Sequence, residues 1–99
     1  MLLIVGTVRI PPGSIDTARP AMKRMIAATR AEDGCLDYFY AEDVADPGRI
    51  HVIELWRDRD ALDRHFGAAH LSEWRDEWPR LGITDRDLRL YEVGEAVAV

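Results

Sequence analysis

Histidine and aromatic side chains are concentrated in the second half of this 99-residue sequence. They are His51, Trp56, His65, Phe66, His70, Trp74, Trp78 and Tyr91. An imidazole exchanges a proton near neutral pH, and aromatic rings either line apolar pockets or fill cores. Trp74 and Trp78 recur at helical spacing on one stripe, which favours core packing for these two. Trp56 and His70 are the stronger candidates for a functional site.

Glu54 and Trp56 are two residues apart in an apolar run, so in a strand they share one face. A carboxylate beside an indole on a buried face is costly unless it is paired, and this predicts a cavity with some polar lining. His70 follows a helix break at Gly67, where a side chain can point into such a cavity. We expect His70 and Trp56 to face one cavity and His65, on the preceding helix, to point elsewhere.

Nothing in the spacing of the remaining polar residues favours a metal or nucleotide site. His65 and His70 are five residues apart, whereas zinc-binding histidines on one helix are usually four apart. The charged run over residues 58–64 is typical of a solvated helix face. Glycine-rich phosphate loops, a nucleophile elbow and a C-x-x-C pair are absent from the sequence. We therefore expect no metal site.

Apolar periodicity predicts four strands with helical segments between them. Strands are expected at residues 2–10, 35–42, 49–56 and 88–93. Helices are expected at residues 14–32, kinked at Pro20, at 58–66, and from Gly67 to Pro79. Ser14 and Asp58 are candidate N-caps, and Gly34 is a candidate left-handed helix end. The order β, α, β, β, α, β predicts an α+β, ferredoxin-like fold with a four-stranded antiparallel sheet.

Both faces of the expected strands are apolar, which indicates a partner. The first strand carries Leu3 and Val5 on one face and Leu2, Ile4, Val8 and Ile10 on the other. The third strand repeats this pattern, with Ile50 and Val52 on one face and Ile53 and Leu55 on the other. Two helical segments can cover only one face of a four-stranded sheet. The second face is expected to meet a copy of itself in a homodimer.

Length, composition and charge further limit the class of protein to which this sequence can belong. Ninety-nine residues make one domain, 1–99, and 47% of them are apolar, as in globular proteins. The net charge of −5 disfavours nucleic acid and anionic membrane surfaces as partners. The single cysteine, Cys35, fits a reducing cytoplasm, and the apolar start is too short for a signal peptide or a membrane span. A cytoplasmic location is therefore expected.

Three short motifs follow one another along the chain. They are Glu32-Asp33-Gly34-Cys35-Leu36-Asp37-Tyr38, Glu54-Leu55-Trp56, and Ala61-Leu62 with His65, followed by Ala68-Ala69-His70. In this order they resemble the E-x-G-C-L-x-Y element, the E-x-W strand end and the A-L-x-x-H…H helical region of the antibiotic biosynthesis monooxygenase (ABM) domain family. The resemblance runs over nearly the whole chain and implies a dimeric α/β barrel in which two sheets pack face to face.

The resemblance also implies an activity, because members of the family oxidise polycyclic phenols or simple quinols to quinones without a cofactor. We expect a small aromatic substrate, molecular oxygen as co-substrate, and no flavin or metal. His70 is the candidate acid/base, and Trp56 is expected to line the pocket and stack on the substrate ring. The expected substrate-binding residues are Thr7, Tyr38, Glu54 and Phe66.

Two other functions remain open. One is a non-catalytic ligand-binding dimer of the same fold, since a fold alone does not imply an enzyme. The other is haem binding with His70 as axial ligand, because a haem-degrading branch of the family resembles this chain at Trp56 and at Ala68-Ala69-His70. That branch carries an asparagine on its first strand where the nearest residue here is Thr7, which disfavours haem degradation.

Overall fold

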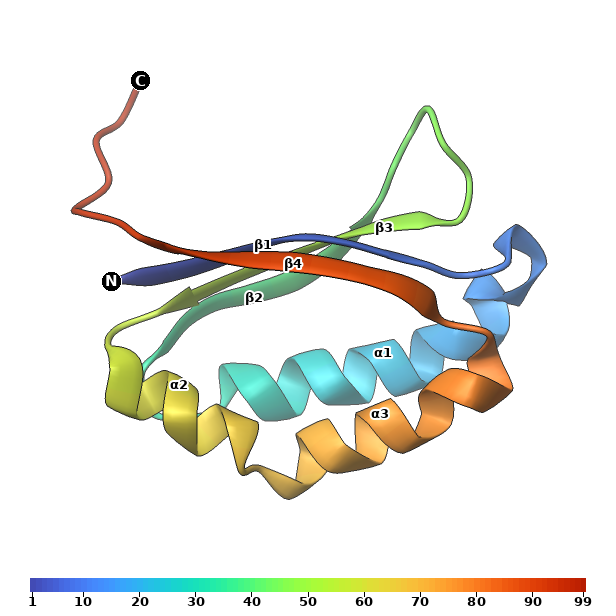
Figure 1. Ribbon diagram of the computed structural model, residues 1–99, viewed down its shortest axis with the longest axis horizontal. Coiled ribbons are helices and arrows are strands. Elements are labelled where there is room, and N and C mark those ends of the chain that lie inside the picture. The colour runs from blue at the N-terminus through green and yellow to red at the C-terminus, as the bar shows by residue number, and fades with distance from the viewer.

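A single antiparallel sheet forms one layer of the molecule, and the helices form a second layer on one of its faces (Figure 1). The computed structural model describes all residues, 1–99. The spatial strand order is β2-β3-β1-β4. The bounds are β1 at Leu2–Arg9, β2 at Cys35–Glu42, β3 at Arg49–Trp56 and β4 at Thr84–Glu92. The predicted ferredoxin-like fold with a four-stranded antiparallel sheet is confirmed.

Three α-helices cover the inner face of the sheet. They are α1 at Ile15–Arg30, α2 at Arg59–Phe66 and α3 at Ala69–Leu81, and a short 3-10 turn, η1 at Pro12–Ser14, precedes α1. The helices α1 and α3 pack against each other, and α2 leads into α3 through a break at Gly67–Ala68 (Figure 1). Asp58 caps α2 as predicted, because its side chain accepts a hydrogen bond from the Ala61 amide at 2.9 Å.

The ends of some elements differ from the prediction. Ser14 makes no side-chain capping bond, since the η1 turn already leads into α1 and leaves the start of α1 without a side-chain cap. Pro20 is accommodated inside α1. Pro79 does not end α3, which continues to Leu81 and stops at Gly82 in the left-handed conformation (φ 74°).

The last strand begins at Thr84, four residues before the predicted start at Leu88. The residues from Thr84 to Asp87 are all polar, so they carry no alternation from which a strand could be predicted. Pairing with β1 imposes the strand instead, with Thr84 opposite Arg9 and Asp87 opposite Thr7. The register is irregular between Thr7 and Arg9.

The hydrophobic core lies between the sheet and the helices. The inner face of β1 contributes Leu2, Ile4 and Val8, all buried, and that of β3 contributes Ile50 and Val52. Met22 and Met25 of α1 and Leu71 and Trp74 of α3 cover them, with Trp78 packed at the edge of this cluster. The opposite, outer face is formed by partly exposed apolar residues: Leu3, Val5, Phe39, Ile53 and Leu55. The predicted two-faced strands are therefore present.

The approach of β1 to β4 depends on Gly6. A Cβ atom at this position would lie 1.9 Å from the backbone oxygen of Asp87, so any larger residue would push the two strands apart. Gly6 pairs with Leu88, whose side chain contributes to the inner face. None of the helices has the length and apolar character needed to cross a membrane.

Candidate functional site

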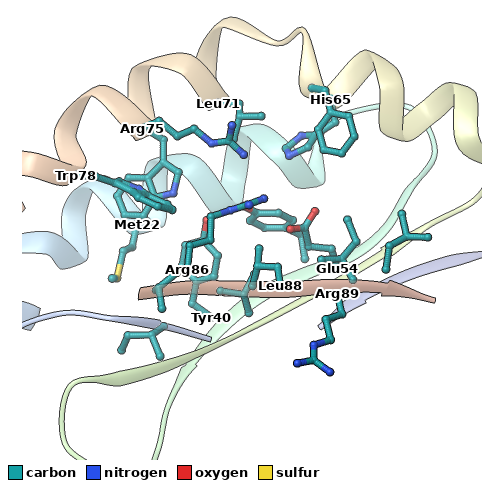
Figure 2. A pocket seen from close by; sticks show the side chains of 18 residues that line it. Met22, Tyr40, Glu54, His65, Leu71, Arg75, Trp78, Arg86, Leu88 and Arg89 are labelled. Carbon is teal, nitrogen blue, oxygen red and sulfur yellow. The ribbon is translucent and has the colours of Figure 1, made fainter. Parts of the chain in front are cut away.

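A cavity of about 180 Å³ lies between the inner face of the sheet and the helix layer. Most of its lining is apolar, and every strand and α-helix of the chain contributes (Figure 2). Seven lining residues carry a titratable side chain: Tyr38, Tyr40, Glu54, His65, Arg75, Arg86 and Arg89. Arg89 differs from the other six because its guanidinium group points away from the cavity (Figure 2). The cavity therefore combines apolar walls with a small set of converging polar groups.

Glu54 is the buried carboxylate of this cavity. It lies on the inner face of β3 with 6% of its surface exposed. The indole Nε1–H of Trp56 donates to its Oε1 atom at 3.0 Å, and its second oxygen has no hydrogen-bond partner. Burial raises the pKa of the Glu54 carboxyl above its usual value, while the Trp56 hydrogen bond and nearby positive charges oppose this rise. Glu54 is thus a carboxylate of increased basicity with one free oxygen.

This raised pKa predicts a pH dependence of stability. A carboxyl that is less acidic in the folded chain keeps its proton longer in the native state, so the native state binds more protons than the unfolded state. The contribution of Glu54 to stability therefore falls as pH rises from the ordinary value of 4.5 toward its higher folded pKa. We expect Glu54→Gln to remove this fall, so that the variant gains stability relative to the native chain as pH rises above 4.5. Urea unfolding across this range measures the difference; a difference that does not change with pH would contradict the assignment.

Tyr38 and Tyr40 place two hydroxyl groups on one side of the cavity. Both come from the inner face of β2, and their hydroxyl oxygens lie 2.6 Å apart. The ring of Tyr40 stacks on Trp74 with the ring centres 6.0 Å apart. Burial raises the pKa of both phenols above their usual value, so both keep their protons at neutral pH. One proton joins the two oxygens, which leaves the other O–H available to a ligand.

Arg75 and Arg86 bring positive charge to the cavity from opposite layers. Arg75 belongs to α3 and Arg86 to β4, and both guanidinium groups extend into the space between them (Figure 2). Neither makes an ion pair, although many other arginines of the chain do. Both act on the Glu54 carboxyl by lowering its pKa. An anion in the cavity would therefore meet two uncompensated positive charges.

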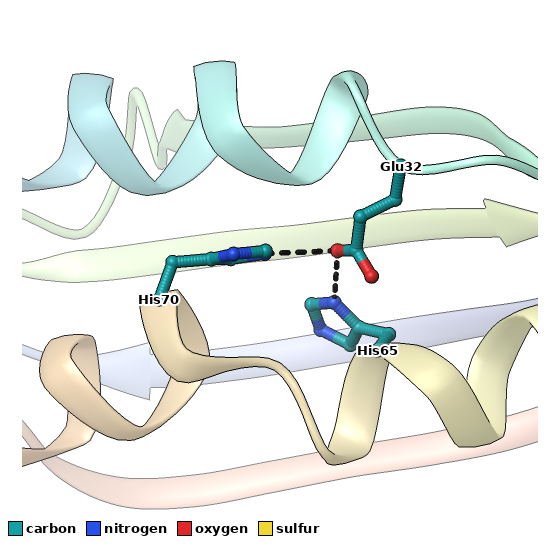
Figure 3. Close-up of side chains that lie close together, drawn as sticks. All are labelled: Glu32, His65 and His70. Carbon is teal, nitrogen blue, oxygen red and sulfur yellow. Dashed lines mark hydrogen bonds and ion pairs between the residues drawn. The ribbon is translucent and has the colours of Figure 1, made fainter.

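Glu32, His65 and His70 form a separate cluster (Figure 3), of which only His65 lines the cavity. Glu32 follows α1, His65 is in the last turn of α2, and His70 is in the first turn of α3. The Oε2 atom of Glu32 lies 2.6 Å from His65 Nδ1 and 2.9 Å from His70 Nε2. The His65 ring is buried, with its centre 4.7 Å from that of Trp56 and 5.8 Å from that of Tyr38.

The structure brings together three of the predicted site residues and separates the other three. Tyr38, Glu54 and Phe66 line the cavity. Trp56 is completely buried, does not line the cavity, and donates its indole N–H to Glu54. Thr7 lies on the outer face of the sheet, opposite His51 and Asp87.

The expectation that His70 and Trp56 face one cavity is wrong. The expectation that His65 points away from that cavity is also wrong. His70 lines a groove between α1 and α3, while His65 lines the cavity. The reason is the break at Gly67–Ala68, which starts a new helix and turns His70 toward α1. A direct contact of His70 or Trp56 with substrate has no support in this geometry.

Sequence reasoning missed Glu32, Arg75 and Arg86. Glu32 is the first residue of the E-x-G-C-L-x-Y segment, so the sequence contained a signal for it. Arg75 and Arg86 belong to no such motif, so the sequence did not distinguish them from surface arginines. The spacing argument against a metal site compared His65 and His70 with histidine pairs that lie on one helix. They lie on two helices, and with Glu32 they offer three ligand atoms within 4.8 Å of one another. This cluster could hold a metal ion.

The same fold and motif order recur in known proteins. Residues 1–77 match the sequence model of the family described as Antibiotic biosynthesis monooxygenase. The chain belongs to this family. Its match covers β1 through most of α3 and so includes Glu32, Glu54, His65 and His70.

Two solved structures are similar to this chain over nearly their whole length. A crystal structure from Deinococcus radiodurans, described as a candidate antibiotic biosynthesis monooxygenase, is 30% identical, with a TM-score of 0.90 over 100% of this chain and 98% of that one. The structure of Rv0793 from Mycobacterium tuberculosis is 28% identical, with a TM-score of 0.77 over 97% and 98% of the two chains.

Two curated relatives are longer than the matched region. Rv0793, named as a candidate monooxygenase, is 41% identical over 64 residues, which cover 65% of this chain and 62% of the relative. The protein sll1783 of Synechocystis, which has no assigned function, is 26% identical over 94 residues, covering 95% and 64%. The chain thus spans somewhat less than two thirds of these two relatives.

Proposed function

We propose that this chain is a cofactor-independent monooxygenase that oxidises a phenolic or quinol-like aromatic substrate to a quinone. The observation that carries the proposal is Glu54, a buried carboxylate with one free oxygen in a small, mostly apolar cavity. The ABM-family match and the name of the Mycobacterium tuberculosis relative support the reaction class. Oxygen is the only co-substrate that the proposal requires.

The size of the cavity favours a small substrate. Its volume of about 180 Å³ is close to the roughly 150 Å³ of an engineered cavity that binds benzene. It lies below the roughly 300–1,000 Å³ typical of pockets for drug-sized ligands. One substituted ring fits this space better than a polycyclic phenol, which favours a simple quinol over the larger substrates of the family.

Glu54 is the base in this proposal. Its free oxygen lies in the mostly apolar cavity, and its raised pKa brings it closer to that of a phenol, which favours proton transfer. Arg75 and Arg86 favour the resulting phenolate because both are unpaired and positively charged. A tyrosine O–H of the Tyr38–Tyr40 pair can donate to a second substrate oxygen.

The reaction then balances without a cofactor. The phenolate gives one electron to O₂, and the two radicals combine at a ring carbon that carries hydrogen, forming a C–O bond. The peroxide takes the proton back from Glu54, and loss of that hydrogen together with the terminal hydroxyl releases water and leaves the quinone carbonyl. One oxygen atom enters the product and one becomes water. The protein holds the reactants together and keeps water out.

Oxygen uptake tests this proposal directly. The full chain, kept in a metal chelator without added cofactor, is mixed with a panel of single-ring hydroquinones and phenols. We expect one O₂ consumed per quinone formed, above the rate of the buffer alone. Binding of panel members without oxygen uptake would support the non-catalytic ligand-binding alternative instead.

Haem binding is less well supported by these residues. The Nε2 atom of His70, the expected axial ligand, lies 2.9 Å from Glu32 Oε2, and His70 lines the groove between α1 and α3, not the cavity. The cavity of about 180 Å³ is also small beside the space that a cofactor of drug-like or larger size needs. The residues present therefore do not fit a haem in the cavity.

We further propose that the protein acts as a homodimer formed through the outer face of the sheet. Leu3, Val5, Ile53 and Leu55 form an apolar strip there that no helix of this chain covers. We expect sedimentation at micromolar concentration to give twice the chain mass of 11.3 kDa. Ile53→Asp, which places a charge at the centre of the strip, should give a monomer. A native chain that sediments as a monomer would contradict the dimer.

A further inference from the structure

We propose that Glu32, His65 and His70 bind one divalent transition-metal cation of the zinc type. The site is distinct from the Glu54 carboxylate and is not required by the proposed oxygen chemistry. It is formed by three segments of the chain that are far apart in sequence: the end of α1, the end of α2 and the start of α3.

The geometry of the three side chains carries this inference. Each offers one ligand atom, and the three atoms lie within 4.8 Å of one another. The two imidazole nitrogens converge on the same carboxylate oxygen, at 2.6 Å and 2.9 Å (Figure 3). Zinc binds imidazole nitrogen and carboxylate oxygen at about 2.0–2.2 Å, so a cation between them needs only small side-chain shifts. It would replace the protons that now join the imidazoles to Glu32.

The ligand types select the class of cation. Mg²⁺ and Ca²⁺ prefer oxygen ligands alone, whereas two imidazoles and a carboxylate suit zinc and its neighbours in the first transition series. Three protein ligands also leave at least one coordination position for water. By contrast, the His51–Asp43 pair at 2.8 Å offers only two such groups on the opposite part of β3, and it is the natural control.

The cluster combines two largely buried ligands with one that is accessible from solvent. The His65 side chain is only 3% exposed and the Glu32 side chain 15%, so two of the ligands are held by their surroundings. His70 is 26% exposed and lines the groove between α1 and α3, through which a hydrated ion can reach the site. Surface clusters of acidic groups lack this combination of a rigid, buried ligand and an accessible one.

Binding would have a consequence for the cavity. A cation on Nδ1 of His65 requires the proton of the neutral ring to reside on Nε2, so the ring could then only donate a hydrogen bond at its remaining nitrogen. Because His65 also lines the cavity, occupancy of the site would fix the hydrogen-bonding character of one of its polar residues. The cation would also connect the ends of three helices.

Zinc titration of the full chain tests the proposal. We expect calorimetry to show one Zn²⁺ per chain, with affinity that falls as pH is lowered and with proton release that depends on the buffer, because the imidazoles must lose their protons. Cobalt should bind the same site and develop visible absorption. His70→Ala and Glu32→Gln should each weaken binding by at least about 100-fold, since even partners of metal ligands contribute about 10–100-fold.

His51→Ala, which removes the unrelated His51–Asp43 pair, should leave zinc binding unchanged. Thermal melts without metal establish that each variant is folded. Absence of stoichiometric zinc binding by the native chain, or equal affinity in a folded His70→Ala variant, would overturn the proposal. Activity is not part of this measurement, so the metal site and the monooxygenase proposal can fail independently.

Discussion

Glu54→Gln is expected to lower the rate of quinone formation by about 10²–10⁴-fold, the usual contribution of a positioned general base. Glutamine keeps the shape of the side chain and can still accept the Trp56 hydrogen bond, but it cannot take a proton from the substrate. The fold should persist, because the variant no longer has to bury an ionisable carboxyl. Oxygen uptake under saturating substrate measures the effect on kcat.

Glu42→Gln is the matched control for this variant. Glu42 lies on β2, the edge strand that pairs with β3, but it is exposed and outside the cavity, so its loss should leave kcat unchanged. In the native chain, kcat/KM should rise with pH across a pKa that is higher than that of an ordinary glutamate. Full activity of Glu54→Gln on a substrate that the native chain oxidises would rule out Glu54 as the base and direct the search to His65, the imidazole that lines the cavity.

The fold was largely predictable because its signals are local. Alternating or continuous apolar residues marked β1 and β3, and a helical stripe marked α3 through Leu71 and Trp74. The start of β4 was not predictable, because Thr84 to Asp87 are polar and become a strand only by pairing with β1. Pairing with β1, and not a local preference for extended structure, therefore makes this segment a strand.

The site was predictable only in part, because it depends on where helices end. Period-two reasoning placed Glu54 and Trp56 on one face correctly, and their hydrogen bond is present. Whether His65 or His70 faces the cavity depends on the direction in which α3 leaves the break at Gly67, and no residue type records that direction. The convergence of Glu32 with both histidines likewise arises from the packing of α1 against α3.

Trp56→Ala is expected to destabilise the protein by about 3–5 kcal/mol, the usual cost of truncating a buried large aromatic residue. Trp56 is completely buried, and its ring packs on His65 with the ring centres 4.7 Å apart. The expected loss is a large share of the roughly 5–15 kcal/mol that stabilises a typical domain. Urea unfolding measures it, and a loss below about 1 kcal/mol would contradict the burial of this side chain.

Trp56→Phe separates this packing role from the role of the indole N–H. Phenylalanine retains most of the ring volume, so the Trp56→Phe variant should be destabilised less than the Trp56→Ala variant. It cannot donate to Glu54 Oε1, however, and the Trp56 hydrogen bond is the largest of the contributions that oppose the raised pKa of that carboxyl. The pH at which activity appears should therefore move upward in Trp56→Phe. Trp74→Phe, which changes a buried tryptophan without a bond to Glu54, should leave that pH unchanged. An unchanged pH profile in Trp56→Phe would mean that Trp56 acts through packing alone, since only the hydrogen bond connects it to the acidity of Glu54.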